Sequence, residues 1–275
     1  MRFACAEDMV WQSGRTRPLR ALFLSDIHLG SRACKSDRLI DFLGHHQAET
    51  LYLVGDIVDG WRLSAKWYWP PAHDLALHAI LRAVREGTRL VYVPGNHDAF
   101  MRDYYGRHFA GIEVVASAVH VAADGGRYLV THGDQFDRLA RHRRGVASLG
   151  RLADHTANSV NAMINVVRRQ IDLPDWSLSR WTKHSLKTAT NFIGGFERAV
   201  VDDARRHGAA GVICGHVHHP ADHADLGIHY VNCGDWIESC TAAVEHVDGG
   251  FEVVTWPAQD ARTGSVPTQA QARAA

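Results

Sequence analysis

Cysteine is scarce in this sequence, and no two cysteines have the CxxC spacing of a metal-binding or redox pair. An odd number is scattered over 275 residues, at positions Cys5, Cys34, Cys214, Cys233 and Cys240. Neither a disulfide framework nor a thiolate zinc site is therefore indicated. Reduced thiols in a cytoplasmic protein are the simplest interpretation.

Long hydrophobic runs are missing as well, although 46% of the residues are hydrophobic and 22% are charged. No window approaches the roughly 20 uninterrupted apolar residues of a membrane-spanning helix, so the sequence predicts a large globular core instead. Residues 1–18 lack the apolar segment and the small-residue cleavage site of a signal peptide. We interpret them as a flexible leader and expect a cytoplasmic location.

The chain has no net charge, because Lys and Arg total 30 and Asp and Glu also total 30. This balance argues against a nucleic-acid partner, and nothing in the sequence indicates an obligate protein partner. The charge is uneven locally, since residues 135–210 hold 13 Lys and Arg against 7 Asp and Glu, a net charge of +6. Either an anionic partner binds near this segment or its basic residues form a solvated helix face.

Apolar runs rich in Val, Ile, Leu and Tyr predict buried strands at residues 19–24, 51–54, 90–93, 128–131, 211–214 and 228–232. Apolar residues at helical spacing lie between the first three runs, at 39–43 and 75–84. This alternation predicts an α/β fold with a largely parallel sheet and helices outside. Further runs at 241–247 and 251–256 predict a second sheet packed on the first.

Residues 135–210 interrupt the alternation with apolar residues at helical spacing, which predicts a helical insertion in a domain that spans residues 19–257. Residues 258–275 lack periodicity and predict a disordered tail. Arg180, Lys183 and Lys187 have helix-compatible spacing in the insertion. They are candidates for holding phosphate or the sugar-linked groups of a substrate, or else they belong to a solvated helix face.

Polar motifs follow five of the predicted strands, and loops at the carboxyl ends of strands line a common crevice in open α/β sheets. The motifs are Asp26-Ile27-His28, Gly55-Asp56-Ile57-Val58-Asp59, Gly95-Asn96-His97-Asp98, His132-Gly133-Asp134 and Gly215-His216-Val217-His218. Dipeptides such as Gly-Asp are common in turns, which accounts for any one motif. Turn chemistry explains neither the histidines nor the repetition, so we expect the motifs to form one site.

Imidazole, carboxylate and amide ligands suit two divalent ions, with the carboxylate of Asp56 bridging them through its two oxygens. A shell of nitrogen and oxygen disfavours calcium and leaves Mn, Fe, Zn or Co, of which we expect Mn. Two such ions activate water for attack on phosphorus. The sequence therefore predicts hydrolysis of a phosphoester without a covalent enzyme intermediate.

The order of these motifs resembles the calcineurin-like metallophosphoesterase family from about residue 21 to 254. The resemblance implies two packed mixed β-sheets flanked by helices, a four-layer α/β sandwich. One metal would be bound by Asp26, His28, Asp56 and His218, and the other by Asp56, Asn96, His132 and His216. His97 would be the acid that protonates the leaving oxygen, and Asp59 would orient its ring.

Gly60 stands where protein serine/threonine phosphatases of this superfamily carry an arginine, which argues against that class. Residues 61–71, the insertion and residues 232–240 resemble a branch related to UDP-2,3-diacylglucosamine diphosphatases of lipid A synthesis. This resemblance implies a nucleotide-linked lipid as substrate, UMP and a lipid monophosphate as products, and peripheral contact with the inner membrane face. It also implies that the insertion at 135–210 is a helical cap over the metals. Those enzymes typically have arginine at the position of His97, so this chain falls in a neighbouring subgroup.

Two alternatives are a phosphodiesterase for a soluble nucleotide or another phospholipid, and a non-catalytic metal-binding scaffold. The scaffold is disfavoured because every expected ligand position holds a competent residue. The aromatic side chains of Trp61, Trp67, Tyr68 and Trp69 form either an apolar wall for a lipid or ordinary packing under a loop. Trp61 is the substrate-binding candidate among them.

Overall fold

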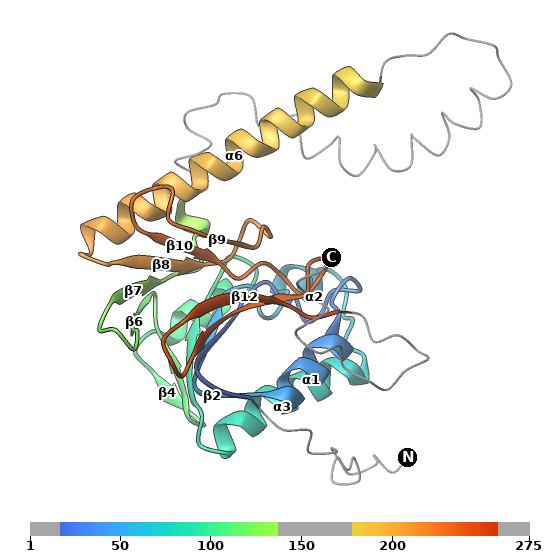
Figure 1. The fold of residues 1–275 in the computed structure, drawn as a ribbon. Helices are drawn as coiled ribbons and strands as arrows, with labels where there is room; N and C mark the ends of the chain where they lie inside the picture. The colour runs from blue at the N-terminus through green and yellow to red at the C-terminus, as the bar shows by residue number, and fades with distance from the viewer. Residues whose placement is uncertain (1–16, 137–177, 258–275) are drawn as a thin grey trace, which may run out of the picture. The chain divides into compact units, whose positions relative to one another are not determined.

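The computed structural model describes residues 17–136 and 178–257, with side chains of the long helix described from Phe192 onward (Figure 1). The chain divides into two compact units, Met1–Asp134 with Asp203–Ala275, and Gln135–Asp202. The predicted insertion at 135–210 falls largely in the second unit, and its role as a cap stays a prediction. The predicted leader and tail lie almost entirely outside the described residues.

The first unit contains a seven-stranded sheet in the order β12-β11-β1-β2-β3-β5-β4. Its strands are β1 (Arg17–Leu24), β2 (His46–Val54), β3 (Arg89–Val93), β4 (His108–Phe109), β5 (Ile112–Val114), β11 (Thr241–His246) and β12 (Phe251–Thr255). Strands β1, β2, β3 and β5 are parallel neighbours, whereas β4, β11 and β12 pair antiparallel. The register sets Leu24 beside Leu53 and Val54 beside Val93, so the three central strands end together.

The second sheet has five strands in the order β6-β7-β8-β10-β9. They are β6 (Ala118–Val121), β7 (Arg127–Val130), β8 (Gly211–Cys214), β9 (Ala221–His223) and β10 (His229–Asn232). Strands β7, β8 and β10 are parallel, and the edge strands β6 and β9 run antiparallel to them. Val130, Ile213 and Val231 lie side by side, so these strands also end at one edge.

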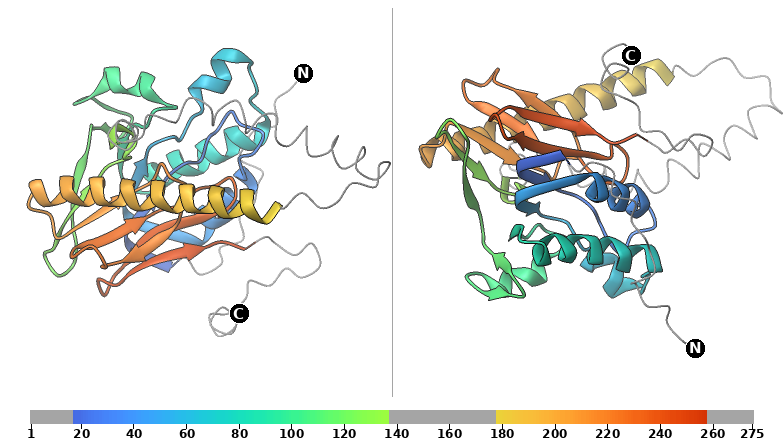
Figure 2. Two further views of the ribbon diagram at one scale, coloured as in Figure 1. Left: turned by 90° about the horizontal axis from the view of Figure 1, so that it is seen from above. Right: turned by 60° about the horizontal axis from the view of Figure 1, so that its bottom comes forward.

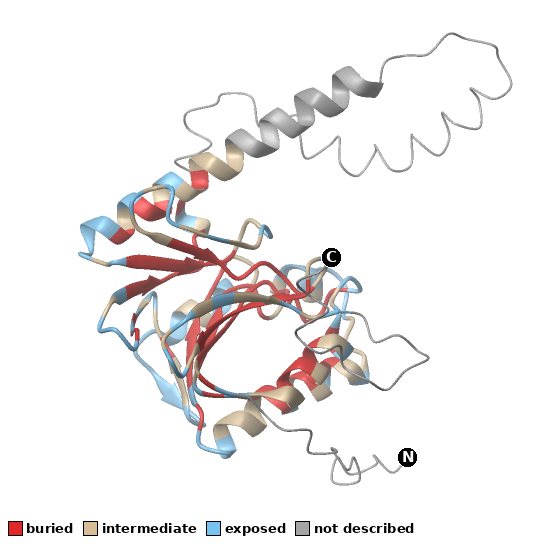
Figure 3. Ribbon diagram, viewed as in Figure 1, coloured by how far each residue is buried: buried red, intermediate tan, exposed pale blue. Residues whose placement is uncertain are grey.

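The sequence of strand β1 is almost continuously apolar because each of its faces packs into a different hydrophobic core. Leu22 and Leu24 pack beneath helices α1 (Ser36–His45) and α3 (Pro71–Arg85). Ala21 and Phe23 pack between the two sheets instead, where they meet residues of β7, β8 and β10. Burying each large side chain contributes about 1.5–3 kcal/mol relative to leaving it exposed. Buried residues accordingly follow the strands of both sheets (Figure 3).

Helices α1 and α3 lie side by side (Figure 2, right). Both are amphipathic, and α3 buries His73, Ala76, Ala79 and Ile80 along one face. Its proline stands in the first turn, where a missing backbone N–H costs nothing. A shorter helix, α2 (Gly60–Ala65), and two 3-10 turns, η2 (Ala99–Tyr104) and η3 (Asp134–Phe136), follow strands at the sheet edge that carries the polar motifs.

The prediction of two packed mixed sheets flanked by helices is confirmed. The prediction that the runs at 241–247 and 251–256 form the second sheet is wrong. They are β11 and β12, which extend the first sheet because β11 pairs antiparallel with the free edge of β1. The second sheet is built from β6 to β10. Apolar periodicity shows that a strand is buried, but it does not show which edge it joins.

The remaining described element is α6 (Leu178–Arg206), which begins in the second unit and ends in the first. Its described part buries Phe196, Val200, Val201 and Ala204, spaced as on one helix face. Among the described residues, no helix combines the length and the apolar character needed to cross a bilayer.

Candidate metal centre

The polar motifs occupy the loops after the parallel strands, where the carboxyl ends of the two sheets meet. The backbone N–H of Trp236 donates to the Asp26 carbonyl oxygen at 3.1 Å, and the backbone N–H of His216 donates to Asp26 Oδ2 at 2.8 Å. His132 Nδ1 lies 2.8 Å from the carbonyl oxygen of Val54. These contacts join loops from different sheets, so residues far apart in sequence are held in one place.

The backbone of these loops is strained at the candidate ligands. Seven described residues other than glycine have a positive φ, a conformation that is costly for most side chains. Five of the seven are candidate metal ligands, namely Asp26, His28, Asp56, His216 and His218. Such strain concentrates at functional sites, where the surrounding structure holds it in place.

Two loop glycines are required because a neighbouring ligand occupies the space of a side chain. Gly55 has a φ of +80°, and a Cβ there would overlap the imidazole of His132. A Cβ at Gly95 would overlap Asp56 Oδ1 and would lie 2.7 Å from the ring of His132. The glycines of these motifs therefore allow close approach of the loops as well as a turn.

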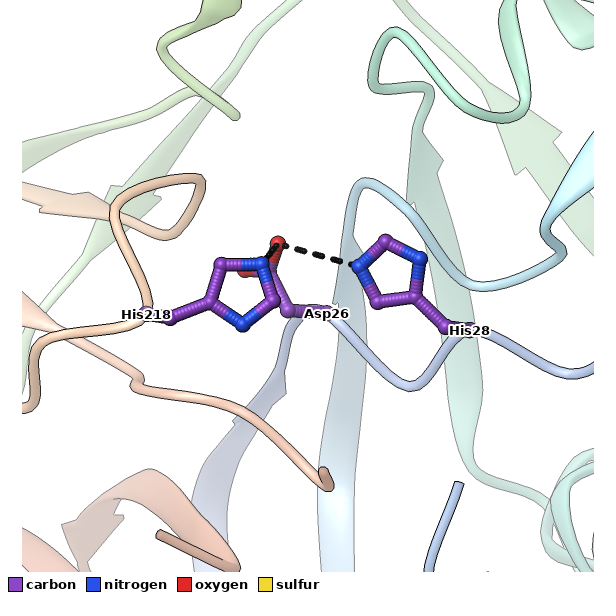
Figure 4. Close-up of side chains that lie close together, drawn as sticks. All are labelled: Asp26, His28 and His218. Atoms are coloured by element: carbon purple, nitrogen blue, oxygen red, sulfur yellow. Dashed lines mark ion pairs between the residues drawn. The ribbon is translucent and has the colours of Figure 1, made fainter. Parts of the chain in front are cut away.

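Asp26, His28 and His218 form the first group of candidate ligands, with one ligand atom of each within 4.8 Å of the others (Figure 4). Asp26 Oδ1 lies 3.7 Å from His28 Nε2 and 3.3 Å from His218 Nε2. Asp26 Oδ2 faces away from them, since it accepts hydrogen bonds from the Ser25 hydroxyl and the His216 N–H. One oxygen of Asp26 is thereby left to face two imidazole nitrogens.

Asp56, His132 and His216 form the second group within the same distance limit. His132 Nε2 lies 3.4 Å from Asp56 Oδ2, and the rings of His132 and His216 are 5.1 Å apart at their centroids. Asp56 Oδ1 accepts a hydrogen bond from the backbone N–H of His97 at 2.8 Å, whereas Oδ2 also lies 3.9 Å from His28 Nε2. The oxygen that faces both groups is thus Oδ2 alone, where the sequence led us to expect both oxygens, and Oδ1 fixes the orientation of the carboxylate.

Several buried atoms of this centre have no hydrogen-bond partner among the described residues. They include Asp26 Oδ1, His28 Nε2, Asn96 Oδ1 and His132 Nε2. Buried polar atoms are normally paired, and leaving one unpaired costs about 1–3 kcal/mol. Each of these four atoms can offer a lone pair to a cation, and together they form a mixed nitrogen and oxygen donor set. The residues therefore fit a pair of divalent ions.

The electrostatics of the centre favour positive charge. Burial lowers the pKa of an imidazole, but the hydrogen bonds and charges of neighbouring carboxylates outweigh burial and raise the pKa of His28 to about 9. Burial also lowers the pKa of His132, but the hydrogen bond to Asp56 and the charge of Asp56 outweigh burial and raise this pKa to about 10. Burial raises the pKa of Asp26, yet the surrounding histidines hold it well below its usual range. The carboxylates that favour these imidazole protons would favour a divalent cation in their place.

His97 lies beside the centre and is held by a carboxylate. Its Nδ1 is 3.0 Å from Asp59 Oδ1, and its ring meets the His28 ring edge to face at 4.6 Å. The other oxygen, Asp59 Oδ2, lies 3.5 Å from His28 Nδ1. Burial raises the pKa of Asp59, but hydrogen bonds from His28 and His97 outweigh it and hold the pKa far below its usual range. One ionised carboxylate thereby orients both rings.

Comparison with known proteins identifies the family. The sequence model of the calcineurin-like phosphoesterases matches residues 19–220. The chain belongs to this family. Members of the family are metallophosphoesterases that use divalent metal ions, and the chain is a hydrolytic enzyme.

Two relatives of this phosphoesterase are each named UDP-2,3-diacylglucosamine hydrolase. The protein of Pseudomonas paraeruginosa is 27% identical over 220 residues, covering 75% of this chain and 85% of its own. The protein of Stenotrophomonas maltophilia is 24% identical over 246 residues, covering 84% and 96%. A solved structure described as a novel archaeal phosphodiesterase has a TM-score of 0.41 and 13% identity, covering 86% of this chain and 98% of its own.

The aromatic residues of the phosphoesterase after Asp59 fall into two kinds. Trp69 Nε1 donates to Asp74 at 2.7 Å, and the Arg32 guanidinium lies 4.8 Å above the Tyr68 ring, so these two rings pack within the fold. Trp61 and Trp67 are 57% and 73% exposed. The Trp61 ring centroid is 4.1 Å from that of His97, which places this indole at the margin of the metal centre.

The basic candidates Arg180, Lys183 and Lys187 lie in α6, but their side chains are outside the described residues. Their proposed contact with the substrate stays a prediction.

Sequence reasoning missed two carboxylates of the phosphoesterase that hold the loops. Asp98 accepts the N–H groups of Gly95 and Ile57 at 2.6 and 2.8 Å and the Tyr92 hydroxyl at 2.5 Å. Asp235 caps the loop after β10 and faces His218. The position of Asp98 at the end of the motif that begins at Gly95 could have indicated its role. No sequence pattern indicates Asp235, which only the fold brings to the centre.

Proposed function

We propose that this phosphoesterase hydrolyses the pyrophosphate of UDP-2,3-diacylglucosamine or a closely related nucleotide-linked lipid, releasing UMP and a lipid monophosphate. The observation that supports this substrate is the alignment of relatives bearing that name over most of their own length. The metal centre supports the reaction class, because its unpaired donors fit two divalent ions.

Asp26, His28, Asp56 and His218 would hold one ion, and Asp56, Asn96, His132 and His216 the other. We expect Mn²⁺ in both places, since the donors are nitrogen and oxygen and no described cysteine belongs to the groups. Such a pair activates water for attack on phosphorus and neutralises charge on the phosphoryl oxygens. Asp56 sets the spacing of the two groups, because its Oδ2 faces a histidine of each.

His97 would donate a proton to the leaving oxygen. Asp59 accepts the Nδ1 proton at 3.0 Å and so leaves Nε2 as the nitrogen available to the substrate. The indole of Trp61 packs against the His97 ring and restricts its rotation. General acid catalysis of this kind typically contributes 10²–10⁴-fold in rate.

His97 also favours a second candidate, a phosphodiester of another phospholipid or of a soluble nucleotide. An alkoxide is a poor leaving group and gains much from protonation, whereas a phosphate leaving group gains little. The Asp59–His97 pair supplies such an acid. The established diphosphatases that this chain resembles typically have arginine at the position of His97. A guanidinium stabilises a negatively charged leaving group such as phosphate.

A lipid substrate is also consistent with the exposed indoles of Trp61 and Trp67, which lie in a segment that carries Arg62 and Lys66 and no acidic residue. Indole rings and basic side chains together favour the boundary of an anionic membrane. We therefore propose that the enzyme acts in the cytoplasm with peripheral contact to the inner membrane.

The test is a substrate panel with the full chain and Mn²⁺, with products identified by mass spectrometry. UDP-2,3-diacylglucosamine should yield UMP and the lipid monophosphate, and UDP-N-acetylglucosamine, which lacks the acyl chains, should react far more slowly. Turnover of phosphatidyl or nucleotide diesters alone would support the second candidate instead. Binding of two Mn²⁺ ions without turnover of any phosphoester would indicate a scaffold.

A further inference from the structure

We propose that Asp235 is a positioning residue for His218: the carboxylate holds the proton on Nδ1 of that imidazole and so presents Nε2 to a metal ion. The inference rests on the metal centre of the proposed function. It assigns to the loop after β10 a part in metal binding that neither the motifs nor the family match supplies.

Asp235 is fixed in place by its own loop. Its side chain is buried, and Oδ1 accepts three backbone N–H groups, those of Ile237, Glu238 and Ser239, at 2.8, 2.6 and 3.2 Å. Because these three donors hold Oδ1, the carboxylate cannot rotate without breaking them. Oδ2 therefore points in a set direction, toward His218 Nδ1 at 3.5 Å.

His218 is the most exposed of the candidate histidine ligands. Its side chain is 37% exposed, whereas the side chains of His28 and His132 are 5% and 1% exposed and are held by packing. The residue lies in a loop between β8 and β9 rather than in a strand. The ring stacks on that of His28 at 5.3 Å between centroids, but this contact does not determine which ring nitrogen carries the proton.

The contacts of His218 Nδ1 and of His218 Nε2 both fit an imidazole that binds a metal ion through Nε2. A carboxylate only accepts hydrogen bonds, so when a metal ion takes the place of a proton at Nε2, Asp235 would hold the remaining proton on Nδ1. At the other end, Nε2 lies 3.3 Å from Asp26 Oδ1, a buried oxygen without a hydrogen-bond partner. The lone pair of Nε2 and this oxygen then face the same point.

The two buried histidines of the centre, His28 and His132, follow the same arrangement with different acceptors. His28 Nδ1 faces Asp59 Oδ2 at 3.5 Å, and His132 Nδ1 faces the Val54 carbonyl oxygen at 2.8 Å. In each case Nε2 points to a carboxylate oxygen of the centre. Acceptors of this kind fix the tautomer of a ligand and typically change metal affinity by 10–100-fold when removed.

The experiment compares Asp235→Asn with the wild-type full chain in titrations with Mn²⁺ alone, followed by calorimetry and by metal analysis after dialysis. The three backbone donors keep the amide oxygen at the position of Oδ1, so the amide NH₂ faces Nδ1. An NH₂ donor beside Nδ1 favours the tautomer of His218 with its proton on Nε2, and a protonated Nε2 cannot bind a metal ion. We expect one of the two Mn²⁺ sites to weaken about 10–100-fold, while the other is unchanged.

Two controls separate positioning from a loss of structure. Glu238→Gln makes the same carboxylate-to-amide change on an exposed neighbour in the same loop and should leave both sites unchanged. Asp235→Asn should add no further loss of affinity in a His218→Ala background, because the ligand it orients is gone. An equal loss in both backgrounds would show a merely structural role and would overturn the inference.

A measurement on the wild-type chain does not depend on the folding of a variant. In the Zn²⁺-loaded protein, long-range ¹H–¹⁵N spectra should show a downfield, slowly exchanging proton on Nδ1 of His218. Its absence, or two intact Mn²⁺ sites in folded Asp235→Asn, would overturn the inference and leave the proposed function standing. A wild-type chain that binds no divalent ion would overturn both.

Discussion

At the scale of single residues, the chemistry of this centre depends on individual atoms more than on residue types. The two oxygens of Asp56 differ, since Oδ1 accepts the His97 N–H and Oδ2 faces His28 and His132. The two oxygens of Asp26 divide in the same way. One atom of each carboxylate sets its orientation, and the other is available to a metal ion.

Asp56→Asn tests the shared carboxylate. The amide keeps the size of the side chain and an acceptor for the His97 N–H, but it places a neutral NH₂ donor where Oδ2 faces both groups. We expect turnover to fall below detection and fewer than two Mn²⁺ ions to bind per chain, measured by phosphate-release assay and metal analysis. Asp124→Asn, an exposed change in a turn, serves as the control. Near-normal turnover by Asp56→Asn with two bound ions would contradict the bridging role.

His97→Gln separates proton donation from metal binding. The side chain is absent from the two groups around Asp26 and Asp56, although it forms a third cluster with His28 and Asp59, and its backbone N–H holds Asp56. We expect kcat to fall by about 10²–10⁴-fold, with Mn²⁺ stoichiometry and the melting temperature unchanged. A substrate with an activated leaving group, such as a nitrophenyl ester, should lose less. An equal loss for both kinds of substrate would argue against a role as acid.

The sequence predicted the residue types of the centre because five motifs repeat the same ligand chemistry after strands. It did not predict which ring nitrogen each histidine uses, since that depends on acceptors such as the Val54 carbonyl and Asp235. The carboxylate of Asp235 lies more than 200 residues from Asp26 in sequence and reaches the centre only through the pairing of strands. Such contacts leave no local pattern.

At the scale of elements, the site is made by loops that end parallel strands. The register brings β1, β2 and β3 to a common end in one sheet and β7, β8 and β10 in the other. The loops pack so closely that Gly55 and Gly95 have no room for a side chain. Ligand placement therefore depends on backbone contact between loops.

Gly55→Ala and Gly125→Ala form a matched pair that measures this packing. Both glycines have positive φ, +80° and +85°, but a Cβ at Gly125 meets nothing within 4 Å, whereas one at Gly55 overlaps the His132 ring. Gly125→Ala should cost about 1–2 kcal/mol of unfolding free energy from backbone strain, with activity retained. Gly55→Ala should cost a further 1–3 kcal/mol or so from overpacking and should abolish activity, as read by urea unfolding and turnover. Equal effects of the two changes would argue against the close approach.

Apolar runs predicted the central strands within a few residues, because each is buried on both faces. The short strands β4, β5, β6 and β9 were not predicted, since each has only two to four residues, too few to form an apolar run. Strand β2 begins at His46, earlier than the predicted run at residue 51, because its first residues are polar. Polar strand starts pair through their backbone, which apolar patterns do not reveal.

At the scale of the whole molecule, a buried polar cluster links the two sheets away from the metal centre. His120 of β6 lies 2.7 Å from Glu245 of β11 through Nε2 and 3.3 Å from the Tyr52 hydroxyl of β2 through Nδ1. Glu245 also accepts Arg20 Nε at 3.3 Å and the Ala123 N–H at 2.7 Å. These hydrogen bonds join the two sheets, and because one partner is an imidazole we expect their contribution to stability to depend on pH.

Burial lowers the pKa of His120 below its ordinary value of 6.5, although Glu245 pulls it upward. The unfolded chain therefore binds a proton at this residue at a higher pH than the folded chain. Its contribution to stability is complete above pH 6.5 and is lost as the pH falls below that value. His120→Gln should cost about 1–3 kcal/mol at pH 8, and this difference should shrink between pH 6.5 and 5.

Urea unfolding of both chains across this range measures the difference, because all other titrating groups are common to the two. His246→Gln is the control, since its contact with Glu252 is at the surface and should contribute little at any pH. A difference between wild type and His120→Gln that grows as the pH falls would show that burial does not dominate.

The central claim is that loops from two sheets create a centre for two divalent ions around Asp56. Crystals grown with Mn²⁺, with diffraction data collected at the manganese absorption edge, test it most directly. We predict two anomalous peaks on either side of Asp56 Oδ2, roughly 3.5–4 Å apart, one near Asp26, His28 and His218 and the other near His132 and His216. No peak, a single peak, or peaks away from these side chains would contradict the account.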